Sequence, residues 1–163
     1  RREAVAALHD ALVSARIAAY AQGFSLIRAA SERHGWHIDL KEVARIWTGG
    51  CIIRAKLLRG IMAAYAADPS LPSLLLAPDF VEHFTIADQA WRNVLSAAVS
   101  VGIPMPAMSA SLAYYDGYRT AKLPQNLTQA QRDAFGAHTY VREDKPEGGH
   151  VHTDWLGVGA GSR

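Results

Sequence analysis

The sequence has little cysteine, little net charge and no long uninterrupted apolar run. Among its 163 residues Cys51 is the single cysteine, so no disulfide forms within the chain, and we expect a reducing, cytoplasmic location. The formal net charge of +2 is too small to indicate a nucleic acid or an anionic lipid surface as partner. Charged residues interrupt the apolar runs well before the roughly 20 residues that cross a bilayer, so we expect no membrane span.

Apolar residues recur at helical spacings through most of the chain. The repeat is longest over residues 2–34, where apolar residues follow two faces, which predicts one long helix buried on two sides. No useful alternation typical of strands is present. We therefore predict an all-α fold, a multi-helix domain with one long central helix and an extended C-terminal tail. Further helices are expected over residues 39–47, 51–67, 78–101, 106–121 and 128–136.

Two polar pairs predict where short helices begin. Asp39 is followed three residues later by Glu42, and Thr128 by Gln131. In a capping box the first side chain accepts a hydrogen bond from a free backbone N–H of the first turn. These pairs predict N-caps at Asp39 and Thr128.

Beyond residue 140 the helical period ends, and charged residues and glycines follow. We therefore divide the chain into a helical domain, residues 1–140, and an extended tail, residues 141–163. The tail contains Gly157, Gly159 and Gly161, a spacing that occurs in dinucleotide-binding loops. Such a loop needs a strand before it and a helix after it, and neither is predicted here, so we expect no nucleotide site in the tail.

The histidines form two close pairs, His34 with His37 and His150 with His152. No further ligand has the spacing of a metal site, and Cys51 lies beside isoleucines, so we predict no metal centre. The sequence also has no paired carboxylates, Ser-His-Asp set or phosphate-binding loop, and the residues by themselves assign no catalytic group.

Two arginines are candidates for binding an anion. Arg54 and Arg132 each lie in the first or second turn after a predicted helix start, where free N–H groups and the helix dipole favour negative charge. His138 follows shortly after Arg132, so a short helix could direct both side chains at one phosphorylated ligand. The alternative is that both arginines form surface or interhelical ion pairs.

Long strings of the sequence resemble, in order, the C-terminal helical domain of decarboxylating 6-phosphogluconate dehydrogenases. The resemblance covers nearly the whole chain without a visible gap. The strings are Tyr20-Ala-Gln-Gly-Phe24, Trp47-Thr-Gly-Gly-Cys-Ile-Ile-Arg54, Gly102-Ile-Pro-Met-Pro106, Tyr114-Tyr-Asp-Gly-Tyr-Arg119, Leu123-Pro-Gln-Asn-Leu127, Gln129-Ala-Gln-Arg-Asp-Ala-Phe-Gly-Ala-His-Thr-Tyr140 and His152-Thr-Asp-Trp155.

The resemblance implies an NADP-dependent enzyme of gluconate metabolism and the oxidative pentose phosphate pathway. Its relatives oxidise 6-phosphogluconate and decarboxylate the 3-keto intermediate to ribulose 5-phosphate. They are homodimers whose separate N-terminal domain binds most of the NADP. The resemblance places this chain in the last third of such an enzyme, with residues 141–163 inserting into the partner subunit. The family's catalytic lysine and glutamate precede this segment, so we expect no catalytic residue here and no turnover by this chain alone.

The resemblance also assigns roles to the candidate residues. It implies that Arg132 binds the substrate phosphate and that His138 binds the substrate, both in the neighbouring subunit's pocket. Arg54 matches a family motif without an implied ligand role and stays a possible anion site. The alternative function is a free-standing helical dimerisation or interaction module that is derived from this fold and has no catalytic activity.

Overall fold

The structure is a computed structural model that describes residues 2–49, 56–155 and 157. The chain forms two compact units, Arg1–Tyr118 and Arg119–Arg163. Among the described residues, six α-helices carry nearly all of the regular structure, beside two short 3₁₀-helices and one pair of two-residue strands. The predicted all-α class with one long helix is confirmed.

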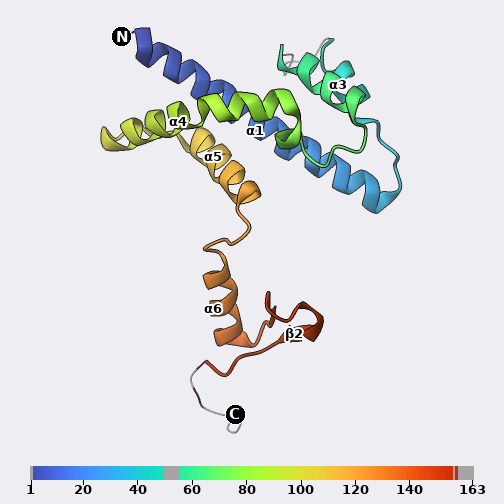
Figure 1. The fold of residues 1–163 in the computed structure, drawn as a ribbon, viewed down its shortest axis with the longest axis vertical. Helices are drawn as coiled ribbons and strands as arrows, with labels where there is room; N and C mark the ends of the chain where they lie inside the picture. Colours follow the sequence, from blue (N-terminus) through green and yellow to red (C-terminus); the bar gives the residue numbers. More distant parts are fainter. Residues whose placement is uncertain (1, 50–55, 156, 158–163) are drawn as a thin grey trace. The chain divides into compact units, whose positions relative to one another are not determined.

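The first unit is built on two long helices that pack along each other, α1 and α4 (Figure 1). The shorter helices α2 and α3 form a second packed pair, and η1 contacts both α1 and α4. The helices of this unit are α1 (Arg2–His34), α2 (Leu40–Ile46), α3 (Leu57–Ala67), η1 (Leu74–Leu76), α4 (Pro78–Ser100) and α5 (Pro106–Arg119).

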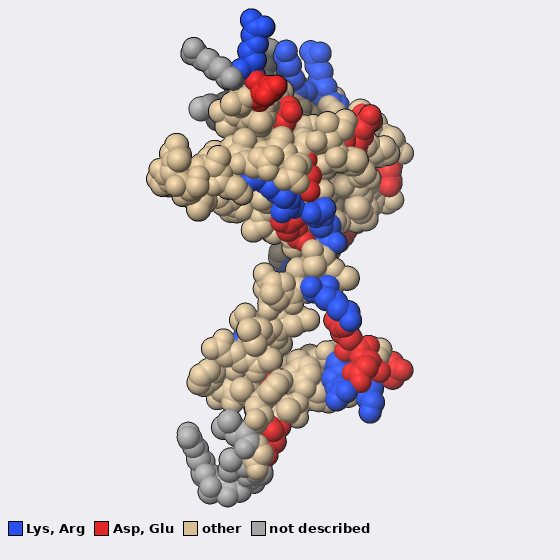
Figure 2. Space-filling view, turned by 60° about the vertical axis from the view of Figure 1, so that its left-hand side comes forward, with Lys and Arg blue, Asp and Glu red and all other residues tan. Residues whose placement is uncertain are grey.

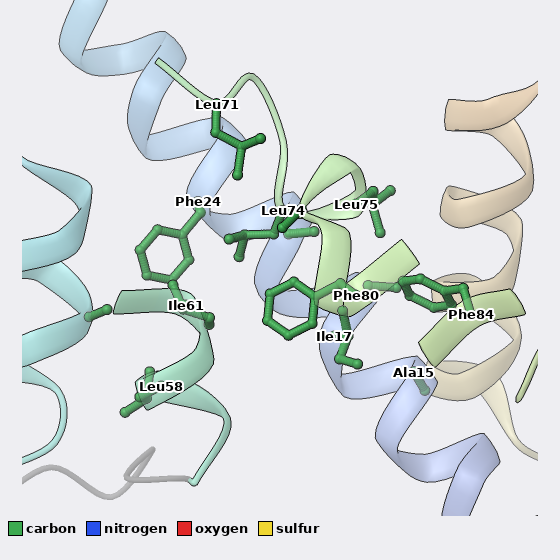
Figure 3. Close-up of a cluster of buried hydrophobic side chains, with 14 of the residues drawn as sticks. Ala15, Ile17, Phe24, Leu58, Ile61, Leu71, Leu74, Leu75, Phe80 and Phe84 are labelled. Atoms are coloured by element: carbon green, nitrogen blue, oxygen red, sulfur yellow. The ribbon is translucent and has the colours of Figure 1, made fainter. Parts of the chain in front are cut away.

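The core of the first unit collects side chains from α1, α3, η1 and α4 (Figure 3). Phe24 of α1 is fully buried, and its ring meets the ring of Trp47 edge-on at 5.4 Å between centroids. Leu74 of η1 is also fully buried, so the helical turn after α3 contributes to the core. This core holds the first unit together without cross-links.

Only one side of α1 is buried within the described residues. Ile17 and Phe24 face the core, whereas Val5, Leu8 and Leu12 are 63%, 48% and 48% exposed. The expectation of burial on two sides is therefore met on one side, and an apolar face remains open.

Helix α1 is also long and apolar enough to cross a membrane by length and composition, with an 18-residue window of mean hydropathy 1.2. The uninterrupted apolar runs of the sequence did not predict this. In the structure α1 supplies much of the core against α4 and η1, which is the arrangement of a core helix.

The helix starts test the two capping predictions. Asp39 is the N-cap of α2, and its Oδ1 accepts hydrogen bonds from the N–H groups of Lys41 at 2.8 Å and Glu42 at 3.3 Å. The prediction for Thr128 is wrong, because α6 (Asn126–Gly136) begins two residues earlier. The start predicted near Cys51 lies outside the described residues.

The second unit consists of α6 and a small antiparallel hairpin of β1 (Tyr140–Val141) and β2 (His150–Val151). Tyr140 pairs with Val151, and Val141 with His150. The 3₁₀-helix η2 (Pro146–Gly148) and Gly149, at φ 68°, reverse the chain between the strands. The sequence predicted no strand in this stretch, because strands of two residues are too short to show alternation.

Candidate substrate-binding site

A cavity of about 680 Å³ lies within the second unit. Arg132 reaches it from α6, and His138 reaches it from the turn that follows the helix. The structure therefore brings together the two residues that the sequence proposed for one ligand. The other lining residues used below are Lys122, Gln129, Tyr140, Arg142 and Trp155.

The turn that carries His138 has an unusual backbone. Ala137 and Thr139, on either side of His138, have φ of 51° and 58°, in the left-handed region that residues other than glycine rarely adopt. The N–H of Ala137 donates to the carbonyl of Asp133 at 2.8 Å and closes the helix end. Two left-handed residues in three need support from surrounding contacts.

Two side chains of α6 provide that support, because they form hydrogen bonds with both the backbone N–H and the carbonyl of Thr139. The N–H of Thr139 donates to Asp133 Oδ1 at 2.8 Å, and its carbonyl accepts from Gln129 Nε2 at 2.6 Å. Gln129 and Asp133 are four positions apart and therefore share one face of the helix. The turn is thus fastened to α6 beside the cavity.

Gln129 also holds Arg132. Its Oε1 accepts a hydrogen bond from Arg132 Nη1 at 3.0 Å, while its Nε2 donates to the Thr139 carbonyl. These partners agree on the orientation of the amide, because an arginine only donates and a carbonyl only accepts. One side chain therefore connects the arginine to the turn that carries the histidine.

Asp133 is fully buried and connects the helix to residues 152–155. Besides Thr139, it accepts hydrogen bonds from His152 Nδ1 at 3.0 Å, the Thr153 N–H at 3.0 Å and Trp155 Nε1 at 2.8 Å. Burial raises the pKa of the Asp133 carboxyl, but these hydrogen bonds outweigh burial and hold the pKa well below its usual range. Asp133 is therefore ionised at neutral pH.

The cations that line the cavity differ in their partners. Lys122 Nζ lies 3.3 Å from Glu143 Oε2, and Arg142 Nε donates to Asp144 Oδ1 at 2.8 Å. Basic and acidic side chains accordingly lie side by side in this unit (Figure 2). Arg132 instead donates to the uncharged Gln129 amide, and among the described residues it has no ion pair with a carboxylate. Of the three, Arg132 is the best placed to bind an anion such as a phosphate.

The ring of His138 packs against the end of α6. A Cβ added at Gly136 would lie 3.1 Å from His138 Nε2 and 3.2 Å from Cδ2. This spacing is tighter than ordinary van der Waals contact, so the absence of a side chain at Gly136 gives the ring its position.

The remaining site predictions have different outcomes. Arg54 lies outside the described residues, so its possible anion site stays a prediction. Across residues 2–49, 56–155 and 157, no group of three or more His, Cys, Asp or Glu side chains is arranged to hold a metal ion.

The sequence by itself predicted no role for Gln129, Asp133 or Trp155. All three lie within the strings that carry the family resemblance. Spacing in the sequence does not show that Asp133 and Trp155, 22 positions apart, form a hydrogen bond.

Comparison with known proteins connects this site to a class of enzyme. The family model "6-phosphogluconate dehydrogenase, C-terminal domain" matches residues 1–155. The chain belongs to this family of helical dehydrogenase domains.

Individual relatives agree with the family match. The decarboxylating 6-phosphogluconate dehydrogenase of Synechocystis sp. is 54% identical over 149 residues, which are 91% of this chain and 31% of the relative. That of Treponema pallidum is 49% identical over 159 residues, 98% of this chain and 33% of the relative. The chain thus spans about a third of the length of these curated relatives.

A solved structure shares the fold. The Plasmodium falciparum 6-phosphogluconate dehydrogenase, described in its apo form and in complexes with NADP⁺ and with 6-phosphogluconate, superposes with a TM-score of 0.88. It is 42% identical, and the match covers 94% of this chain and 32% of that one.

Proposed function

We propose that these 163 residues form the C-terminal part of an NADP-dependent, decarboxylating 6-phosphogluconate dehydrogenase and supply one side of its substrate site. The main support for this proposal is that Arg132 and His138 line one cavity. Gln129 connects them, because it hydrogen-bonds to Arg132 and to the carbonyl of Thr139 beside His138. A guanidinium binds a phosphate through paired donors, and an imidazole beside it binds sugar hydroxyls. Arg132 therefore binds the phosphate of 6-phosphogluconate, and His138 binds the rest of the substrate.

The described residues do not fit the cofactor. A dinucleotide is held by a strand, a glycine loop and a helix, whereas the strands of the described residues are two residues long and form a hairpin. NADP, which accepts the hydride in this reaction, therefore binds mainly to residues outside this segment. The catalytic lysine and glutamate also belong to the preceding part of the enzyme, so the 163-residue chain alone has no turnover.

The partner in the proposed assembly is a second copy of the whole enzyme, with residues 141–163 inserted into the partner subunit. Exposed apolar side chains in both units support an assembly that covers them. On α1 these include Val5 and Leu8, and on α6 Leu127 and Phe135 are 77% and 85% exposed. Larger exposed apolar patches mark sites of protein–protein interaction.

The compartment we propose is the cytoplasm, consistent with the single cysteine. Relatives of this chain include bacterial enzymes and a chloroplastic enzyme of Arabidopsis thaliana, 53% identical over 148 residues. The family is therefore found in more than one compartment.

The test compares the full-length protein that carries this segment with the 163-residue chain. We expect the full-length protein to form NADPH, CO₂ and ribulose 5-phosphate from 6-phosphogluconate, and the chain alone to form none. NADPH formation by the chain alone would contradict the assignment of the catalytic groups to the preceding residues. A full-length protein that dimerises but does not turn over 6-phosphogluconate would favour the alternative, a helical interaction module without activity.

A further inference from the structure

Gln129 and Asp133, two side chains of α6, have no assigned role. Gln129 hydrogen-bonds to Arg132, and both side chains hydrogen-bond to the backbone of Thr139, the residue after His138. Gln129 is half-buried at the cavity wall, and Asp133 is fully buried behind it. We propose that Gln129 and Asp133 are positioning residues, which hold Arg132 and His138 in the arrangement that binds a phosphorylated sugar acid. This proposal rests on the proposed function of the cavity.

The amide of Gln129 connects Arg132 to the turn after α6. Its amide accepts from Arg132 Nη1 and donates to the carbonyl of Thr139, so both of its polar atoms are in use. Arg132 is exposed and, without this contact, a long arginine side chain would sample many rotamers. The contact therefore limits the arginine to conformations that face the cavity.

The carboxylate of Asp133 connects the same turn to residues 152–155. Its carboxylate receives the Thr139 N–H from the left-handed turn and three further donors from residues 152–155. The tail segment 152–155 thereby supports the turn that presents His138. Tyr140, which follows that turn, adds a hydroxyl hydrogen bond to Thr153. The position of His138 thus depends on a carboxylate that lies behind the cavity.

The consequence is a preorganised site. When Arg132 and His138 are already in place, substrate binding does not cost the conformational entropy of ordering them, so the affinity for the substrate is higher. The phosphate is remote from the carbon atoms that react. Loss of the positioning contacts should therefore weaken binding of substrate more than it slows the chemical step.

The test uses the full-length enzyme with Gln129→Met and Asp133→Asn. Gln129→Met keeps the length of the side chain and removes both hydrogen bonds, and Asp133→Asn removes the charge. We expect the KM for 6-phosphogluconate to rise about tenfold in each variant, with kcat within about threefold and the KM for NADP unchanged. The matched control is Asp79→Asn, which changes an exposed aspartate in the first turn of α4 and should leave all three constants unchanged.

A second experiment distinguishes a positioning role of Gln129 from a merely structural one. It repeats Gln129→Met in the Arg132→Ala/His138→Ala enzyme, which lacks both substrate-binding side chains. A residue that acts only through these two should change kcat/KM there by less than about twofold. A tenfold further loss in that background, or an unchanged KM in the otherwise wild-type enzyme, would overturn the positioning role.

The outcomes also separate this proposal from the proposed function. If Arg132→Ala leaves the KM for 6-phosphogluconate unchanged, the assignment of the cavity itself fails. If Arg132→Ala raises that KM and Gln129→Met does not, only the positioning role fails. Should Asp133→Asn not fold, Gln129→Met decides the matter, because Gln129 is at the cavity wall and its replacement leaves no buried charge unpaired.

Discussion

The backbone N–H of Thr139 donates a 2.8 Å hydrogen bond to the buried carboxylate of Asp133. Each of these residues follows directly after one of the two proposed substrate-binding residues, Asp133 after Arg132 and Thr139 after His138. Together with the hydrogen bond from Gln129 to the Thr139 carbonyl, this contact holds the turn that carries the histidine against the helix that carries the arginine. The positions of Arg132 and His138 relative to each other therefore depend on the Asp133 carboxylate, which does not line the cavity.

The ionisation of Asp133 predicts how stability depends on pH. Because hydrogen bonds hold its pKa below the value of about 3.9 of an unfolded aspartate, its contribution is fully present above that value. The contribution is lost as the pH falls through the lower pKa of the folded protein. We expect the difference in melting temperature between the wild-type protein and Asp133→Asn to be constant from about pH 5 to 7 and to shrink below about pH 4. Thermal unfolding across this range measures it, and a difference that persists undiminished at pH 3 would contradict it.

Gly136→Ala should separate ligand binding from stability. The new methyl group would press on the ring of His138, which is exposed on its other side and would be displaced from its position. Alanine favours the helix by up to about 1 kcal/mol over glycine, so the protein should lose no stability. The KM of the full-length enzyme for 6-phosphogluconate should rise several-fold. In the His138→Ala background the same change should leave the KM unaffected, and an equal rise there would refute the explanation.

Phe24→Ala tests the core of the first unit. Phe24 is fully buried and contacts the rings of Trp47 and Tyr65, so its removal leaves a cavity and should cost about 3–5 kcal/mol in the free energy of unfolding. Leu26, two positions away on the same helix, is 71% exposed and is the matched control. Leu26→Ala should cost less than about 0.5 kcal/mol in urea unfolding of the 163-residue chain. Equal costs would mean that the core is placed wrongly.

The helices were predictable because their signals are local. The apolar spacing of residues 2–34, the cap at Asp39 and Pro78 at the start of α4 all act within a turn or two of the chain. The one wrong cap, at Thr128, shows the limit of such signals, because α6 already begins at Asn126 without a side-chain cap.

The site was predictable only in part. Arg132 and His138 could be proposed from a helix position and from family resemblance, and in the structure both line one cavity. The hydrogen bonds of Asp133 that support these residues could not be predicted, because His152 and Trp155 are 19 and 22 positions away from Asp133 in the sequence. The two-residue strands that bring those partners back are too short to leave a periodic pattern. The left-handed turn was equally hidden, since alanine and threonine carry no signal for it.

The most direct test of the account is the KM for 6-phosphogluconate of the full-length enzyme with Arg132→Ala. A guanidinium that binds a phosphate through charged hydrogen bonds contributes about 2–3 kcal/mol, so we expect the KM to rise by roughly 30- to 150-fold while the KM for NADP stays the same. His138→Ala should raise the same constant by a smaller factor. A KM for 6-phosphogluconate that is unchanged in Arg132→Ala would contradict the proposal that Arg132 binds the substrate phosphate and that its cavity forms one side of the substrate site.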